Sequence, residues 1–196
     1  VQKDSPGLTI NPMHGKLGMR SSTTDEVVFQ DTPVSSANLL GERGRGFNHA
    51  MEILTQSRII IAAQSVGIGQ SALEAAVRFA QMRESFGSPI AQHQAIQFML
   101  ADMKTKIEAS RALTWKTAWE SDNGIRNTES AAHAKRFAAD TAMEITTDAV
   151  QIFGGYGYSE EYPVARLMRA AKVMQIYEGS SQVQRMIIGR EMIRDL

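Results

Sequence analysis

Residues 128–158 read TESAAHAKRFAADTAMEITTDAVQIFGGYGY, and this stretch decides the fold. Small or apolar residues recur there every three or four positions, which places them on one face of a helix over residues 128–153. The glycines that follow end this helix. Because small side chains let helices approach closely, the stretch predicts a helix packed against antiparallel neighbours in a bundle. The face consists of Ala131, Ala134, Ala138, Ala142, Ile145, Ala149 and Ile152.

Two more long helices are expected ahead of this one. Residues 47–83 contain no proline and are rich in alanine, so a helix is expected there. Another, over about residues 92–121, has its own stripe at intervals of three and four, and Gly124 ends it. That stripe consists of Ile96, Leu100, Met103, Ile107, Ser110 and Thr114.

Two shorter helices complete the expected bundle. One follows Pro163, and the last runs from about residue 181 to residue 196, where Ser181 and Gln184 have the spacing of a capping box. The predicted fold class is therefore mainly α, an antiparallel up-and-down helical bundle. We expect this bundle to occupy residues 43–196 as one domain.

Residues 1–42 have the pattern of strands and turns. Thr24–Phe29 is the best strand candidate, and turn signals with proline or glycine surround it. Two or three strands do not form a stable sheet alone. We therefore expect residues 1–42 to be the C-terminal remnant of a β-barrel-like middle domain. The sequence opens on Val1 with neither an initiator Met nor a signal-peptide pattern, so we expect a fragment of a longer protein.

Composition excludes several classes of protein. Of the 196 residues, 43% are hydrophobic, which is enough for a core and argues against disorder. The 21 Lys and Arg balance 21 Asp and Glu, and zero net charge argues against a general polyanion binder. The absence of cysteine excludes disulfide scaffolds, thiolate zinc sites and cysteine nucleophiles. We expect no membrane span, because no apolar run approaches roughly 20 residues.

Three familiar motifs are rejected. Gly67–Ala72 matches G-x-G-x-x-A, but it lies inside a helical pattern rather than after a strand, so close helix packing is the preferred interpretation. The four histidines lack the spacing of a metal site, and no metal is expected. There is no G-x-S-x-G, which argues against an α/β-hydrolase.

Three short segments are candidates for chemistry, each with a purely structural alternative. Arg83–Gly87 is either a helix end with a glycine stop or a clamp for a phosphate and a flat ring. Gln151–Gly155 is a helix stop, or a place where glycines let a ligand approach the backbone. In Tyr177–Ser181, Glu178 either complements the dipole of the last helix or acts as a general base beside amides that bind an oxyanion or a phosphate.

Taken together, these segments resemble the acyl-CoA dehydrogenase family. The resemblance covers essentially the whole sequence, and its motifs occur in family order at family-like spacing. They are Asn38–Glu42, Arg58-Ile59 with Ala62-Ala63, Arg83-x-x-Phe86-Gly87, Gln94, Ala101–Met103, Gln151–Tyr158, and Ile176–Gly179 with Gln182.

The resemblance implies an FAD enzyme that oxidises an acyl-CoA to the trans-2-enoyl-CoA. Glu178 would remove the proton next to the thioester carbonyl, and the flavin would take a hydride from the next carbon. Arg58, Tyr177, Glu178 and Gly179 would contact the substrate. Some relatives carry the base one position before the arginine that matches Arg58, but that position is Ser57 here, which cannot serve as a base.

The resemblance also implies two sets of cofactor contacts. The first, which we call the Arg83 set, would reach the FAD of a neighbouring subunit; the second, the Ser180 set, would contact the FAD of its own subunit. A homo-oligomer, expected to be a tetramer, follows from this. The resemblance further implies fatty acid β-oxidation, electron-transfer flavoprotein as electron acceptor, and the bacterial cytoplasm or mitochondrial matrix as location. The Arg83 set is Arg83, Ser85, Phe86, His93, Gln94, Gln151, Ile152, Phe153, Gly154 and Gly155, and the Ser180 set is Gly179, Ser180, Ser181 and Gln182.

Two alternatives stay open within the same fold. A relative that uses the flavin with oxygen, as an oxidase or monooxygenase, would also need Glu178. A non-enzymatic relative that serves in assembly or binds nucleic acid is the other alternative. Zero net charge and the intact Glu178 count against it, and no nucleic-acid partner is expected.

Overall fold

The computed structural model describes residues 1–194. It divides the chain into two compact units, Val1–Ile53 and a second that begins at Leu54. The boundary expected between residues 42 and 43 stays a prediction.

The first unit contains a two-stranded antiparallel sheet. β1 (Leu8–Pro12) pairs with β2 (Asp25–Phe29), with Leu8 opposite Phe29 and Pro12 opposite Asp25. This confirms the strand expected at Thr24–Phe29. Most side chains of both strands are exposed, since two strands alone enclose no core. A short 3-10 helix, η1 (Ser36–Asn38), follows.

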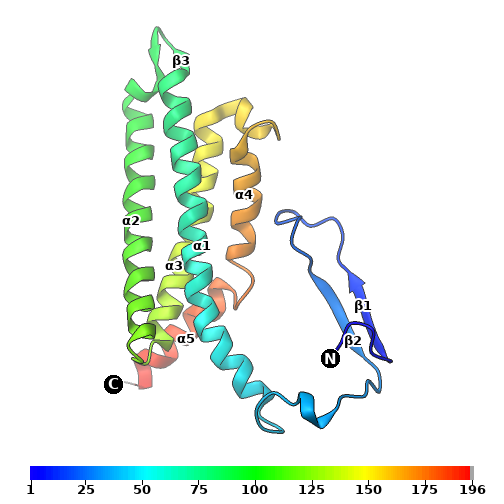
Figure 1. Ribbon diagram of the computed structural model, residues 1–196. Coiled ribbons are helices and arrows are strands. Elements are labelled where there is room, and N and C mark those ends of the chain that lie inside the picture. Colours follow the sequence, from blue (N-terminus) through cyan, green and yellow to red (C-terminus); the bar gives the residue numbers. More distant parts are fainter. Residues whose placement is uncertain (195–196) are drawn as a thin grey trace. The chain divides into compact units, whose positions relative to one another are not determined.

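The second unit is a helical bundle, which confirms the predicted fold class (Figure 1). Its helices are joined by short connections, α1 to α4 alternate in direction, and α5 crosses the lower end of the bundle; α3 packs against α2, α4 and α5. The expected helices are all present, although residues 195 and 196 of the last lie outside the described residues. They are α1 (Gly46–Met82), α2 (Gln94–Asp122), α3 (Thr128–Phe153), α4 (Pro163–Met174) and α5 (Ser181–Arg194). The beginning of α1, up to Ile53, belongs to the first unit.

Small side chains form the core where the long helices meet. All seven residues of the α3 stripe are buried, as are the last four of the α2 stripe. Gly69 of α1 lies at the same contact, because an added Cβ would be 3.6 Å from Cδ1 of Ile145 and 3.7 Å from Cγ1 of Ile107. Within the Gly67–Ala72 motif, close helix packing is therefore confirmed for Gly69, whereas Gly67 is exposed and an added Cβ there would meet nothing within 4 Å.

The apolar character of α1 has a packing explanation. By length and composition, α1 is long and apolar enough to cross a membrane. The expectation that no apolar stretch approaches the length of a membrane span is therefore wrong. Half of that stretch is nevertheless buried in the chain itself, through residues such as Ala62, Ala72 and Ala76. This is the burial of a core helix, whose apolar face packs against other helices.

The capping box predicted for α5 is wrong. Ser180 does the capping instead, because its Oγ accepts a hydrogen bond from the Val183 amide at 3.4 Å. The Ser181 hydroxyl donates to Oδ1 of Asp140 on α3 at 2.8 Å. A tertiary acceptor has thus taken the hydroxyl that the local pattern assigned to the cap.

The glycine stop considered for Arg83–Gly87 is also wrong. α1 ends at Met82, before this segment, and the chain then forms a small hairpin of β3 (Glu84–Ser85) and β4 (Ser88–Pro89). Phe86 and Gly87 form its turn, with φ of +51° and +80°. Two-residue hairpin turns need such left-handed residues, and glycine at the second position meets this need. A 3-10 helix, η2 (Ile90–Gln92), then leads to α2.

Candidate active site and cofactor contacts

Glu178 lies in a strained turn between α4 and α5. Its φ is +55°, and that of Gly179 is +86°. A left-handed conformation costs a non-glycine residue on the order of 1–3 kcal/mol, and such strain clusters at functional sites. Position 179 favours glycine, because its φ is left-handed and an added Cβ would lie 2.6 Å from Nε2 of Gln184. We call Glu178 and Gly179 the Glu178 turn.

Side chains of α1 hold this segment from one side. Oε2 of Glu178 accepts a hydrogen bond from the Ser57 hydroxyl at 2.8 Å. The hydroxyl of Tyr177 donates to Oε1 of Gln64, also at 2.8 Å. Burial, together with the charge of Glu178, raises the pKa of Tyr177. The carboxylate and the neighbouring ring are therefore oriented by the same helix.

Two buried cations lie near the Glu178 turn. Arg58 is 7% exposed, its Nε has no hydrogen-bond partner within residues 1–194, and burial lowers its pKa while Glu178 opposes the change. Lys135 of α3 is fully buried, and its Nζ donates to the Gly179 carbonyl at 2.7 Å. Burial lowers the pKa of Lys135 to about 8; the charges of Asp140 and Glu178 oppose this, and that of Arg58 adds to it.

The pKa of Lys135 predicts how stability changes with pH. Its ordinary value is 10.5 and its folded value is about 8, so between these values the unfolded chain binds more protons and stability rises with pH. For this group the gain is at most about 3 kcal/mol. We expect the thermal midpoint of the full-length protein to rise, relative to that of Lys135→Met, from pH 8 to pH 10.5. Equal pH dependence of the two proteins would contradict this.

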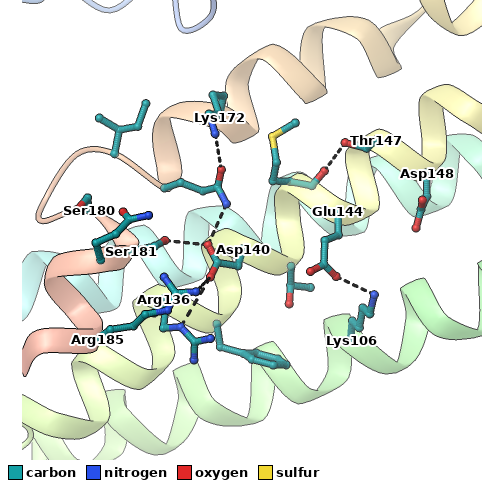
Figure 2. Close-up of a pocket in the computed structure, with 16 residues that line it drawn as sticks. Lys106, Arg136, Asp140, Glu144, Thr147, Asp148, Lys172, Ser180, Ser181 and Arg185 are labelled. Atoms are coloured by element: carbon teal, nitrogen blue, oxygen red, sulfur yellow. Dashed lines mark hydrogen bonds and ion pairs between the residues drawn. The ribbon is translucent and has the colours of Figure 1, made fainter. Parts of the chain in front are cut away.

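Asp140 of α3 ties the connection between α4 and α5 to the bundle (Figure 2). Its Oδ1 accepts from Nε2 of Gln175 at 2.9 Å and from the Ser181 hydroxyl, and its Oδ2 accepts from Arg185 at 3.2 Å. These side chains line a surface cavity of about 1010 Å³, together with Ser180–Gln182. Three members of the Ser180 set therefore lie on a polar cavity.

The Arg83 set gathers around the β3–β4 hairpin. Arg83, Ser85 and Ile152–Gly155 line a second cavity, of about 520 Å³. The Arg83 guanidinium lies 5.7 Å from the centroid of the Tyr156 ring, a distance that permits a cation–π contact. Oγ of Ser85 lies 3.1 Å from Nε2 of His93. The structure thus brings together a cation, a hydroxyl and an imidazole beside exposed glycines.

The other members of this set lie at its edge. Phe86 is fully exposed at the tip of the hairpin, with its ring centroid 6.2 Å from that of His93. Gln94 in the first turn of α2 and Gln151 in the last turn of α3 are exposed. Within residues 1–194, no three His, Asp or Glu side chains gather in a way that could hold a metal ion.

Residues 44–193 match the family described as "Acyl-CoA dehydrogenase, C-terminal domain". The chain belongs to the acyl-CoA dehydrogenase family. The short-chain-specific acyl-CoA dehydrogenase of Megasphaera elsdenii is 50% identical over 194 residues, which are 99% of this chain and 51% of that protein. Cyclohexane-1-carbonyl-CoA dehydrogenase of Geobacter metallireducens is 46% identical over 195 residues, 100% of this chain and 51% of that protein.

Solved structures of acyl-CoA dehydrogenases share the fold. The structure of butyryl-CoA dehydrogenase from Megasphaera elsdenii matches with a TM-score of 0.96 at 50% identity, over 99% of this chain and 51% of that one. The structure of glutaryl-CoA dehydrogenase in complex with glutaryl-CoA matches with a TM-score of 0.93 at 34% identity, over 98% of this chain and 49% of that one. The chain spans about half the length of the curated relatives it matches.

The two sets of predicted cofactor contacts lie toward opposite ends of the bundle, the Arg83 set at the β3–β4 hairpin and the Ser180 set beside α5 (Figure 1). Arg58, near the Glu178 turn, and Arg83 are separated by about 37 Å along α1, at about 1.5 Å per residue. Lys135, which binds the Glu178 turn, and Ile152 are about 26 Å apart along α3. Within one chain, the sets therefore form two separate sites.

Four side chains around the acyl-CoA dehydrogenase motif of Glu178 were not predicted: Ser57 as a hydrogen-bond donor, Lys135, Asp140 and Gln184. A signal for Lys135 was available, because it lies four positions after the buried Ala131, and a lysine on a buried face is rare unless it is paired. No local signal marks Ser57, whose partner is 121 residues away.

Proposed function

We propose that this chain forms the C-terminal half of an FAD-dependent acyl-CoA dehydrogenase in which Glu178 is the catalytic base. The observation that carries the proposal is the Glu178 turn. The backbone of Glu178 is left-handed, its carboxylate is held by Ser57, and two buried cations lie nearby; backbone strain of this kind clusters at functional sites. The 50% identity to a short-chain-specific acyl-CoA dehydrogenase supports the reaction class.

The proposed reaction begins at the carbon next to the thioester carbonyl. Its C–H bond is weakly acidic, so the carbonyl oxygen needs hydrogen-bond donors as negative charge builds up. We assign removal of this proton to the Glu178 carboxylate, whose Oε2 accepts a hydrogen bond from the Ser57 hydroxyl. The backbone amide of Glu178 is the candidate donor, since within residues 1–194 it donates to no backbone carbonyl.

The residues present fit an FAD. When bound, this group supplies an acceptor for the hydride that leaves the second carbon. Ser180–Gln182 lie at the N-terminus of α5, where backbone amides favour phosphate or hydroxyl oxygens. Arg83 and Ser85 place a cation and a hydroxyl beside Gly154 and Gly155, where an added Cβ would meet nothing within 4 Å.

We assign the two sets to cofactors held between two chains. Separations of about 37 Å along α1 and about 26 Å along α3 put the two sets toward opposite ends of the bundle, which favours two different cofactors as their ligands. The Ser180 set would bind the FAD of its own chain and the Arg83 set that of a neighbour. This arrangement needs a homo-oligomer, and we propose a tetramer.

The electron acceptor and location follow as further parts of the proposal. A chain in a solved structure of the electron transferring flavoprotein of Acidaminococcus fermentans is 50% identical to this chain, with a TM-score of 0.96. We propose such a flavoprotein as the acceptor. The named relatives are bacterial, which supports the bacterial cytoplasm as the location.

An oxidase is the second candidate, because the same fold occurs with that activity. The prolyl acyl carrier protein oxidase AnaB matches this chain with a TM-score of 0.94 at 30% identity. Glu178 would serve both reactions, so the fate of the reduced flavin must separate them.

Anaerobic titration of the full-length protein tests the proposed function. A panel of acyl-CoAs that includes butyryl-CoA should bleach the visible absorbance of the flavin, with one 2-enoyl-CoA formed per flavin. On admission of air, slow return of the absorbance supports the dehydrogenase, whereas rapid return with formation of hydrogen peroxide supports the oxidase. If no member of the panel bleaches the flavin, the proposed function is wrong.

A further inference from the structure

We propose that Lys135 is a positioning residue for the proposed base: its buried ammonium holds the Gly179 carbonyl and thereby keeps the Glu178 turn in the conformation that presents the carboxylate. This inference rests on the proposed role of Glu178. It concerns a residue of the bundle core that the reaction itself does not use.

Two buried donors from different helices hold the turn. Nζ of Lys135 on α3 lies 2.7 Å from the Gly179 carbonyl oxygen, and Nε2 of Gln184 on α5 lies 2.9 Å from it. Nε2 of Gln184 also lies 3.2 Å from the Glu178 carbonyl oxygen. Because each peptide group is planar, fixing two successive carbonyls sets the backbone of the residue between them. The two donors therefore hold the left-handed turn from both sides.

The cost of burying Lys135 indicates that it is not there for stability. A buried ammonium with few partners is expensive, and burial outweighs the favourable charges around it, as its lowered pKa indicates. The charges that face it are Arg58 from α1, Glu178 from the α4–α5 connection and Asp140 from α3 itself. An apolar side chain would suit the alanine-rich face of α3 better. The hydrogen bond to a strained turn is what the ammonium adds, and a charged donor makes this bond stronger.

Substitution of Lys135 in the full-length holoenzyme tests the proposal. Lys135→Met should lower kcat at least about tenfold, the effect expected when a charge-assisted hydrogen bond is lost. Affinity for the acyl-CoA should stay within about threefold, and the thermal midpoint at pH 7 should not fall, because Gln184 still satisfies the carbonyl. Amide hydrogen exchange should accelerate in a peptide that covers residues 175–182. Lys116→Met, the same change at an exposed lysine of α2, should leave all four measurements unchanged.

A double-mutant cycle tests whether the two donors share the turn. Gln184→Leu alone leaves Lys135 on the Gly179 carbonyl, so its effect on exchange should be modest. When Gln184→Leu is combined with Lys135→Met, neither side chain donates to the Gly179 carbonyl. The fold-decrease in kcat of the double variant should then exceed the product of the fold-decreases of the two single variants. Lys135→Gln keeps a donor without the charge and should give an intermediate kcat.

The outcomes separate this proposal from the proposed function. If the wild-type flavin is not bleached by any acyl-CoA, the proposed function fails, and hydrogen exchange alone decides the role of Lys135 in the turn. Unchanged exchange and unchanged kcat in Lys135→Met would overturn the proposal. So would a lower thermal midpoint with parallel loss of acyl-CoA affinity, because that pattern describes a residue needed only for folding.

Discussion

Glu178→Gln in the full-length protein should lower turnover of an acyl-CoA at least about a hundredfold, the low end for removal of a general base. Glutamine keeps the shape of the side chain, and its oxygen can still accept the Ser57 hydroxyl. The amide cannot take a proton from the substrate. Binding of the acyl-CoA should therefore stay within a few-fold while kcat falls, and the two are measured by equilibrium titration and by steady-state kinetics.

Glu161→Gln is the matched control for this change. Glu161 is an exposed carboxylate just ahead of α4, so the same substitution there should leave kcat unchanged. Turnover of Glu178→Gln within a few-fold of wild type would show that the base is another group, even if the flavin is still bleached by the wild-type protein.

Arg83→Ala should weaken FAD retention at least about tenfold, because a charge-assisted hydrogen bond contributes about 1.5–3 kcal/mol. The oligomer should dissociate more readily as well, since a ligand that binds two chains at once stabilises their association. Equilibrium dialysis of the flavin and light scattering measure the two effects. Arg78→Ala is the control, because Arg78 lies in the last turns of α1, shortly before Arg83, but pairs with the exposed Glu74. If Arg83→Ala changes neither FAD retention nor oligomer stability, Arg83 does not hold the cofactor.

Mixed oligomers show whether Arg83 acts on a neighbouring chain. If it does, pairing an Arg83→Ala chain with a Glu178→Gln chain places an intact Glu178 and an intact Arg83 at one of the two sites. At a flavin concentration too low to saturate Arg83→Ala, co-expression of the two variants should then give more activity than either variant gives alone. If both residues act on the FAD of their own chain, every site in the mixture is defective. Mixtures that are no more active than the variants alone would therefore contradict the assignment to a neighbouring chain.

Much of the fold could be predicted because helix periodicity is local information. The α3 stripe, from Ala131 to Ile152, lies entirely in the core, as its spacing indicates. The strand at Asp25–Phe29 was equally readable from its composition. The proximity of Arg83 and Gly154 was expected only from the resemblance. It follows because α1 and α3 run in the same direction, so that their C-terminal ends lie at the same end of the bundle.

Local patterns failed where one segment suits two structures. Ser181 has the spacing of a cap, but Asp140 of α3 offers its hydroxyl a better-placed acceptor, and Ser180 takes the cap. Phe86-Gly87 reads as a helix stop, but pairing of the short strands on either side turns it into a hairpin. In both cases a contact made outside the local pattern decided between the alternatives.

By itself, the sequence determined the helices, the buried faces and the residue types available for chemistry, because these depend on neighbours within one or two turns. Tertiary structure alone decided what surrounds Glu178. Ser57 comes from 121 residues away and Lys135 from another helix. The spacing of Lys135 from Ala131 could have indicated its burial, but no local pattern names the partner of either side chain. The tertiary structure also decided that the Arg83 and Ser180 sets are separate sites, since the lengths of α1 and α3 keep them apart. The physical reason is that a backbone period is set along the chain, whereas a hydrogen bond between distant side chains exists only once the helices have packed.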